Sequence, residues 1–382
     1  MPHVINQFTA RLCKDQSGFV LPASLTLMTT LVLLGTTAFI LTSTDIKTAS
    51  NFRNSRLVLD VAIAGAERAR EALRLENLAS SNNQSFSDEL NSAARKGANG
   101  TLDGYSSTTD DVPLATGTLS NVTYSAYLSN DSVDGATNTT DSNGLVMITS
   151  VATGPNNARA QVQIVVSLQS FPISSPATIY AKGDVTGNGS SLTISGNDAC
   201  GVATALSPIY TEDPATTNFS GNPALSGNPS TPQHGTLNID LTSYMNALKS
   251  GATILTQDQN GATYGSASNY GIVYSWPDDP ANFNNQGLKL QNVTGYGILL
   301  VNGDLELGGG FQWNGIIIVT GAITLNGGGN DINISGQVYS GTSTLTDITI
   351  NGGNNIGFDS CKVKNAMAAA PLKLKSWKQN FN

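Results

Sequence analysis

The sequence predicts an α+β fold that is mostly β, with one long N-terminal helix, a small antiparallel sheet and a β-rich head containing parallel β-helix rungs. Three features lead to this prediction: an uncharged apolar run near the N-terminus, a second helical pattern directly after it, and glycine-anchored repeats towards the C-terminus. The composition agrees, because 39 glycines and only 12% charged residues suit short strands joined by tight turns. Long valine and isoleucine runs must still be buried, which argues against a disordered chain.

The apolar run, Phe19–Leu41, contains no charged residue. As a helix rising about 1.5 Å per residue, it is long enough to cross the hydrocarbon core of a bilayer. Arg11 and Lys14 give a mildly basic flank before it, and Asp45 marks its far boundary. A buried core helix is the alternative, but such helices are rarely so long and so free of charge. We therefore expect this run to be a transmembrane segment.

A second helical stage follows. Leu59, Ile63, Ala66 and Leu73 recur at helical spacing and predict an apolar stripe. Together the two stages give a helix over 19–78, about 90 Å long. Its distal half can pack on a head, whereas its proximal half must contact lipid or neighbouring helices. Small residues in the proximal half would let such neighbours approach closely: Ala23, Ser24, Gly35, Thr36, Thr37 and Ala38.

The junction Ser17-Gly18-Phe19 lies immediately before the apolar run. In an ordinary secretory signal the cleavage site follows the apolar stretch. A leader that ends in glycine and is followed by phenylalanine and a hydrophobic helix resembles the type III (prepilin) signal. This resemblance implies that residues 1–18 are a leader, that prepilin peptidase cuts after Gly18, and that the new N-terminal Phe19 is methylated.

The next segment carries a second resemblance. Asn51-Phe-Arg53 leads into an alanine-rich helix containing Ala64-Gly65-Ala66-Glu67. This pattern resembles the PilX N-terminal family of type IV pilin-like proteins, over roughly residues 14–76. The resemblance implies other pilin subunits and the pilus assembly machinery as partners. It also implies a location in the bacterial inner membrane, with the head in the periplasm before assembly and on the cell surface, in the pilus, afterwards.

Besides Gly35, two residues bear on filament packing. Pro22 falls within the first turn of the helix, where backbone N–H groups lack partners in any case. Ala23 would be the fifth residue of the mature chain, a position where most pilins carry glutamate, thought to pair with the terminal amine of the adjacent subunit. Without that charge-assisted contact, Ala23 favours a minor subunit at the tip or start of a filament.

Residues 79–170 predict a loop-rich connection and then a small antiparallel sheet packed on the distal helix. Three segments have strand patterns: Val122–Leu128, Leu145–Ala152 and Ala158–Leu168. A further segment, Leu372–Trp377, alternates apolar and basic residues and predicts a closing strand with its lysines facing solvent.

Residues 171–382 predict the head, which contains repeats. Segments that begin at Ile179, Ile298 and Ile316 share an apolar strand, a polar residue, a glycine and another strand, and a weaker copy begins at Val338. The anchors of the last three are Gly303, Gly321 and Gly341, spaced by 18 and 20 residues. Such a repeat predicts successive rungs of a parallel β-helix, with an antiparallel sandwich of similar hairpins as the alternative. Asparagines that could stack at the turns are Asn326, Asn330, Asn333, Asn351 and Asn354.

Residues 203–285 contain most of the prolines and little of the repeat, and predict an insertion that covers one face or end of the head. Of the three cysteines, Cys13 would leave with the leader, so Cys200 and Cys361 remain as a candidate disulfide. Such a bond could contribute about 4 kcal/mol to stability. Two unpaired buried thiols are the alternative.

The sequence offers little catalytic chemistry. A net charge of −8 without basic clusters argues against nucleic-acid binding. His234 lies in a turn-like context without a nucleophile elbow, and no His/Cys cluster predicts zinc. Some β-helix proteins cleave polysaccharides with clustered aspartates and calcium. The aspartates near rung positions here are Asp184, Asp304 and Asp347, with Asp278-Asp279 beside Trp276.

The first two of these aspartates follow a glycine in a tight corner, where aspartate serves turn geometry. Asp131, Asp134 and Asp141 faintly resemble calcium-binding loops but lack the full spacing of oxygen ligands. We therefore expect no cofactor and no enzyme. The expected function is that of a minor pilin-like subunit whose head serves adhesion, through an unknown surface ligand, or assembly priming. The alternative is a membrane-tethered β-helix that binds or cleaves polysaccharide.

Overall fold

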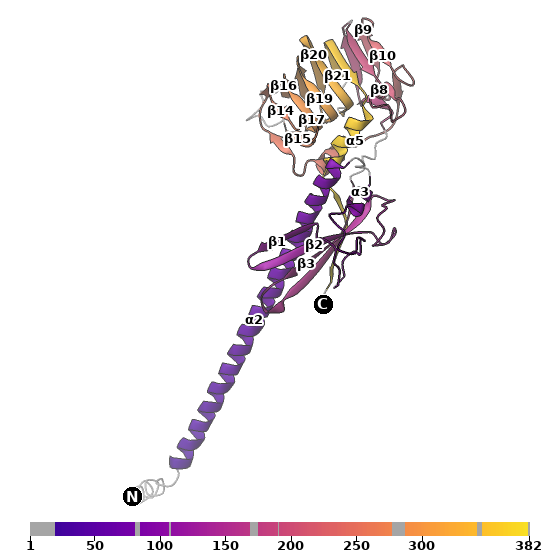
Figure 1. Cartoon of the computed structure of the whole chain (residues 1–382). Coiled ribbons are helices and arrows are strands. Elements are labelled where there is room, and N and C mark those ends of the chain that lie inside the picture. Colours follow the sequence, from indigo (N-terminus) through magenta and orange to yellow (C-terminus); the bar gives the residue numbers. More distant parts are fainter. Residues whose placement is uncertain are drawn as a thin grey trace, which may run out of the picture.

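The structure is a computed structural model of the 382-residue chain. It describes residues 20–80, 85–106, 108–168, 175–189, 191–276, 287–341 and 346–380. A long helix carries a small antiparallel sheet along its distal half and a large parallel β-structure at its far end (Figure 1). This arrangement is the mostly β architecture that the sequence predicts.

The long helix, α2 (Val20–Ala79), is continuous over 60 residues and therefore about 90 Å long. It merges the apolar run and the second helical stage into one element. Pro22 lies in the first turn, where the missing N–H costs no helical hydrogen bond. Among the described residues, α2 is the one helix long and apolar enough to cross a membrane.

The antiparallel sheet has five strands. In spatial order they are β1 (Ala115–Leu119), β2 (Val122–Asn130), β3 (Leu145–Thr153), β4 (Arg159–Ser167) and β22 (Lys373–Asn380). The short elements α3 (Ser87–Asn91) and η1 (Pro155–Asn157) lie in its connections. The three strands predicted between residues 122 and 168 are confirmed, with ends that differ by one or two residues.

The distal half of α2 packs on this sheet through small residues. Ala62, Ala66, Ala69 and Leu73 are buried in a core shared with β2, β3 and β4. Ala66 and Leu73 were predicted for this stripe, whereas Leu59 and Ile63 lie half-buried at its edge. At Gly65 a Cβ would lie 2.6 Å from the Tyr124 ring, so only glycine allows this close approach of helix and sheet.

The last strand, β22, joins the antiparallel sheet rather than the head. It pairs antiparallel with β4, with Leu374 opposite Val166 and Trp377 opposite Ile164. The chain thus leaves the helix region, builds the head and returns (Figure 1). The strand and its solvent-facing lysines were predicted, but its place was not. The apolar side chains expected on the opposite face are exposed as well, because six consecutive side chains of this edge strand are exposed.

The head is a parallel β-helix of short strands in two groups. The N-terminal coils are β5 (Ala177–Ala181), β6 (Asp184–Asn188), β7 (Leu192–Ser195), β8 (Ser207–Glu212), β9 (Thr217–Ser220), β10 (Ala224–Ser226) and β11 (Gln233–Gly235). The C-terminal coils are β12 (Thr253–Leu255), β13 (Gln259–Asn260), β14 (Thr263–Tyr264), β15 (Gly271–Ser275), β16 (Leu288–Gln291), β17 (Thr294–Val301), β18 (Leu305–Gly308), β19 (Gln312–Val319), β20 (Ile323–Ser340) and β21 (Thr346–Gly357).

All named strand pairs in the head are parallel, which decides for rungs and against the sandwich of hairpins. Ile298 lies opposite Ile316, as the 18-residue repeat predicts. The next coil is one residue longer than the predicted 20, because Val319 pairs with Ser340, so Gly341 does not align with Gly321. The strands stack into three faces around one apolar core. Phe311 and Trp313 are both buried in that core, with ring centroids 6.0 Å apart.

The order of the coils in space differs from their order in the chain. The C-terminal coils start at one end with β12 to β14 and rise to β20 and β21. There they meet the first coil of the N-terminal group: Val338 lies opposite Ile179, Ile348 opposite Val185 and Ile356 opposite Ile194. We call this junction the seam, because the two coils that meet there are joined by no short connection along the chain.

The predicted insertion at 203–285 is described over residues 203–276, and most of these residues belong to the stack itself. They contain β8 to β15, which extend the stack at its two ends. Many of these strands have two to four residues and half-exposed side chains, so their hydrophobic pattern is too weak to reveal a rung. Residues 236–252, which include α4 (Leu241–Leu248), leave the stack and connect its last coil to its first.

One face of the β-helix, formed by β5, β8, β15, β17, β19 and the end of β20, is covered on its outer side. Two helices, α4 and α5 (Ser360–Ala368), contact this face. Ile298, Leu300, Ile316 and Ile318 point outward into a second apolar core beneath them. Their neighbours Leu299 and Ile317 point into the main core. Burial on both sides explains the continuous apolar runs of these strands.

Candidate assembly surface, neck and seam

The proximal half of α2 is not covered by any other described part of the chain. No residue from Val20 to Leu57 is buried, and large apolar side chains such as Leu27 and Leu34 are about two-thirds exposed. In water such a surface would be costly, since each fully buried side chain of this kind gains about 1.5–3 kcal/mol. The surface is therefore suited to contact with lipid or with other helices.

Eight hydroxyl side chains of this half donate hydrogen bonds to carbonyls of the helix itself. Thr30 donates to the Leu27 carbonyl at 2.8 Å, and Thr42 donates to the Ala38 carbonyl at 2.8 Å. The same local bond is made by Ser24, Thr26, Thr29, Thr36, Thr37 and Thr44. Hydroxyls that are bonded to their own helix can enter a bilayer without leaving a donor unpaired.

The predicted filament-packing residues lie on this bare half. Pro22, Ala23 and Gly35 are all exposed, and a Cβ on Gly35 would meet no atom within 4 Å. The predicted cleavage and methylation residues, Gly18 and Phe19, lie outside the described residues, so those roles stay predictions.

The helix end meets the returning chain at a neck, which we define as Arg70, Arg74 and residues 369–372. Arg74 donates from Nη1 to the Ala369 carbonyl at 3.0 Å, and Arg70 donates to the Leu372 carbonyl at 3.4 Å. Arg74 also forms two hydrogen bonds to Glu71, which hold the pKa of that carboxyl below its ordinary value. The neck therefore fastens the end of α2 to the chain segment that leaves α5.

Glu89 of α3 is a buried acid beside the end of α2. Its Oε1 accepts a hydrogen bond from Asn77 at 3.2 Å, and burial raises the pKa of Glu89 to about 7. Its Oε2 and the Asn77 Oδ1 are buried and have no hydrogen-bond partner among the described residues. A protonated Glu89 can donate to such an oxygen, whereas the carboxylate cannot.

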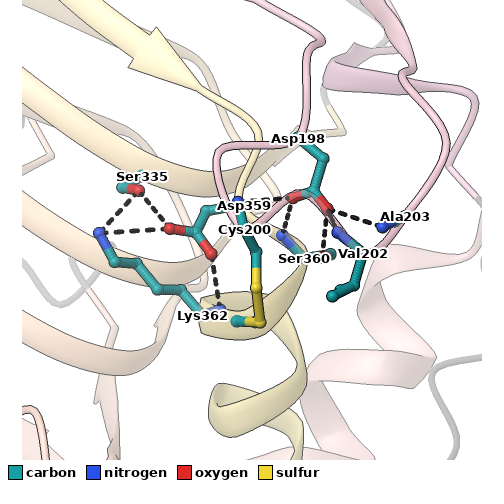
Figure 2. Close-up of a disulfide and its surroundings, with 9 residues drawn as sticks. Asp198, Cys200, Val202, Ala203, Ser335, Asp359, Ser360 and Lys362 are labelled. Atoms are coloured by element: carbon teal, nitrogen blue, oxygen red, sulfur yellow. Dashed lines mark hydrogen bonds and ion pairs between the residues drawn. A yellow bond between two sulfur atoms is a disulfide. The ribbon is translucent and has the colours of Figure 1, made fainter.

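The seam is cross-linked. Cys200, just after β7, and Cys361, in the first turn of α5 after β21, are joined by a disulfide with their Cα atoms 5.8 Å apart (Figure 2). Each cysteine follows one of the two strands that pair across the seam. The bond thus ties the N-terminal coils to the C-terminal coils at the point where β7 pairs with β21.

Polar contacts surround this disulfide (Figure 2). Asp198 accepts hydrogen bonds from Ser360 N at 2.8 Å and from Ala203 N at 2.8 Å. Burial alone would raise its pKa, but these bonds hold the pKa of Asp198 well below its ordinary value. Asp359 caps α5 by accepting from Lys362 N at 3.1 Å. The Asp198 carboxylate therefore bridges the two sides of the seam beside the disulfide.

The three rung aspartates form one column and serve the backbone. They stand one residue before Leu305, Ile348 and Val185, which occupy equivalent positions on strands β18, β21 and β6. Asp304 accepts from Ala322 N at 2.7 Å, and Asp184 accepts from Thr216 N at 2.6 Å. Asp347, which is fully buried, accepts from Gly183 N at 2.8 Å across the seam. Each carboxylate thus links one coil to the next.

The residues of the faint calcium loops also bond to turns. Asp141 accepts from Phe86 N at 2.7 Å and from Gly144 N at 2.7 Å. Asp134 accepts from Ser142 N at 2.8 Å, and Asp131 accepts from Asp134 N at 3.0 Å. Most of these carboxylates thus accept hydrogen bonds from backbone N–H groups of nearby turns, while Asp141 also holds the start of α3.

His234 lies on β11 at the end of the stack, 74% exposed, with Nδ1 3.1 Å from the Asp213 carboxylate. An imidazole–carboxylate pair of this kind needs a positioned nucleophile before it can act in acyl transfer. Trp276 is 58% exposed, and its neighbours Asp278 and Asp279 lie outside the described residues.

The sequence analysis did not identify the neck, because isolated arginines on a helix resemble an ordinary solvent-exposed face.

Together, the fold and these surfaces define a class: a protein with an N-terminal apolar helix able to anchor it in a membrane, and a large β-rich head. No protein-family model matches the sequence, and no curated protein matches it. A solved structure, the competence-associated pilin ComZ from Thermus thermophilus, is similar over 69% of this chain and 86% of its own length. The identity is 13% and the TM-score 0.17, so this pilin-like similarity is distant and transfers no residue between the two chains.

Proposed function

We propose that the protein is a minor type IV pilin-like subunit that is installed in a pilus or pseudopilus and carries its head to the outside. The observation that carries this proposal is the division of α2: its distal half is buried under a sheet, while its proximal half is bare, apolar and long enough to span a membrane. Helices that leave the bilayer and pack among equivalent helices would cover that bare half.

The prepilin-like junction Gly18-Phe19 supports the same pathway, because it lies directly before the helix and not after it. Ala23 supports low copy number at a tip or initiation position, since it cannot supply the carboxylate expected of a repeating subunit. The β-helix and the sheet together also form a head that would be hard to accommodate at every position of a thin filament. We propose that this head acts in adhesion or assembly priming, without catalysis.

Shearing and fractionation test the proposal. Surface filaments are sheared from cells with and without the pilus assembly ATPase, and the protein is quantified against the major subunit by mass spectrometry. We expect it in the sheared fraction at a few copies per filament, and only when the ATPase is present. Retention in the inner membrane under both conditions would favour the tethered β-helix instead.

A further inference from the structure

The β-helix carries a regular array of hydroxyl and amide side chains on its open face, which is formed by β6, β9, β18, the start of β20 and the start of β21. Three strands of this face repeat the pattern Thr-x-Asn: Thr186-Gly-Asn188, Thr324-Leu-Asn326 and Thr349-Ile-Asn351. The fourth strand has Asn218-Phe-Ser220 at the same positions. We call these eight polar residues the Thr/Asn array.

The strand register aligns them in two columns. Thr324 lies opposite Thr349, and Thr349 lies opposite Thr186. The second column places Asn326, Asn351 and Asn188 side by side in the same way. With about 4.8 Å between strands and about 6.6 Å between alternate residues, the array is a two-dimensional lattice of hydrogen-bonding groups.

The array is held rigid from within. The residues that alternate with it, such as Val185, Ile348 and Ile350, are buried in the main core. Asn351 donates from Nδ2 to the Asn326 Oδ1 at 3.1 Å, which orients these two amides. Groups fixed in this way lose little conformational freedom when a ligand binds.

The chemistry of the array favours an uncharged ligand. Hydroxyl and amide side chains offer both donors and acceptors, and none of the eight residues carries a charge. The threonine column continues into one charged pair, since Glu306 lies opposite Thr324 and Lys289 lies opposite Glu306. The two are joined by an ion pair of 2.8 Å, so this end of the column is locally neutral. An anionic or cationic ligand would find no complementary charge here.

The shape of the array favours a polymeric ligand built from small repeated units. Thr186, Asn188, Asn218, Ser220, Thr349 and Asn351 line a hollow of about 250 Å³. This volume lies just below the range of drug-sized pockets and suits a single sugar ring. Since equivalent groups recur on successive strands, a polymer with repeated hydroxyl groups can contact several strands at once.

We infer that the Thr/Asn array binds an extended, uncharged polysaccharide. This inference deepens the proposed adhesive role of the head and rests on it for its biological setting. The array spans the seam, since Thr186 and Thr349 belong to different groups of coils. Binding therefore depends on a closed seam as well as on the side chains.

The test uses the full chain, solubilised in a detergent without sugar headgroups, and insoluble cellulose, chitin and starch as probes. The array variant is Thr186→Lys with Thr349→Lys. The matched control is Thr193→Lys with Asn355→Lys, a pair that also faces across the seam but lies on the third face. Correct folding of both variants is checked by formation of the Cys200–Cys361 disulfide.

We expect at least one of the three polysaccharides to retain the protein and its soluble fragments to displace it. Retention should fall at least tenfold in the array variant and stay within twofold in the control. Retention by none of them, equal retention of the array variant, or binding only to anionic alginate or to ice would overturn the inference. A chain that is correctly processed and found in filaments but does not bind would overturn the array alone, leaving the pilin pathway intact.

Discussion

The antiparallel sheet and the β-helix are both completed by segments from the C-terminal part of the chain, but in different ways. The sheet receives β22 at its edge, where the side chains stay exposed. The β-helix receives β20 and β21 in the middle of its stack, where they are buried and followed by a disulfide. The sheet could therefore be largely formed before its last strand arrives, whereas the head cannot be continuous until its final coils are made.

This comparison teaches where each region is vulnerable. The stalk, meaning α2 with its sheet, depends on the close approach of helix and strands and on one buried acid. The head depends on the seam. Changes at the seam should loosen the head and leave the stalk intact, and changes under α2 should do the reverse.

The largest effect is expected at the disulfide. Replacing Cys200 and Cys361 by serine removes a cross-link between residues 161 apart in sequence. The loss of chain-entropy restraint is worth up to about 5 kcal/mol. Hydrogen exchange should accelerate in β5 to β7, β20 and β21 and remain unchanged in β2 to β4. Equal acceleration of exchange in both regions would contradict the claim that the head can be destabilised without the stalk.

The next effect depends on pH. Because the folded-state pKa of Glu89 is raised from 4.5 to about 7, the folded state binds the proton more tightly than the unfolded state. The free energy of unfolding should therefore fall as pH rises from 4.5 to 7, by up to about 3 kcal/mol, and then level off. In denaturation experiments at a series of pH values, the Glu89→Gln variant should lose most of this pH dependence of the free energy of unfolding. The control Glu67→Gln, on the exposed side of α2, should keep the slope.

A smaller effect is expected under the helix. Gly65→Ala places a Cβ 2.6 Å from both the Tyr124 ring and the Ser150 hydroxyl, and should cost about 1–3 kcal/mol by overpacking. Gly35→Ala is the matched control, because it meets nothing and should gain helix propensity instead. Equal thermal stability of the two variants in detergent would argue against the tight helix–sheet contact.

The smallest effect is expected at the neck. Arg74→Ala removes the hydrogen bond to the Ala369 carbonyl and should cost about 1–2 kcal/mol, because a charged donor is lost. Hydrogen exchange in residues 369–373 should accelerate, while Arg56→Ala, exposed elsewhere on α2, should leave it unchanged. A change that spreads through the whole head would show that the neck supports more than its own segment.

The sequence predicted the parts of the fold whose hydrophobic pattern is strong. The uncharged run, the strand patterns of β2 to β4 and the repeat that aligns Ile298 with Ile316 are all strong hydrophobic signals, and in the strands they reflect side chains buried in a core. The coils between residues 203 and 285 escaped prediction because strands as short as β13 and β14 are held by backbone pairing and carry little apolar pattern. Only three-dimensional stacking shows that they are rungs.

The seam escaped prediction for a different reason. Parallel pairing of β5 with β20 joins residues about 160 apart, and no local pattern distinguishes this neighbour from the next coil along the chain. The corner glycines were equally hidden: Gly297, Gly315 and Gly336 stack with positive φ, and a Cβ on Gly315 would lie 2.2 Å from the Gly297 carbonyl oxygen. The Thr-x-Asn triplets were visible in the sequence but acquire meaning only once the register places them in columns.

The central claim is that the bare half of α2 belongs to a pilin pathway, and the mature N-terminus tests it most directly. The protein is isolated from its native membrane, with and without prepilin peptidase, and its intact mass and N-terminal sequence are determined. The account predicts a chain that begins at methylated Phe19 only when the peptidase is present. An N-terminus that is unprocessed in both cases, or cleaved after Leu41, would contradict it.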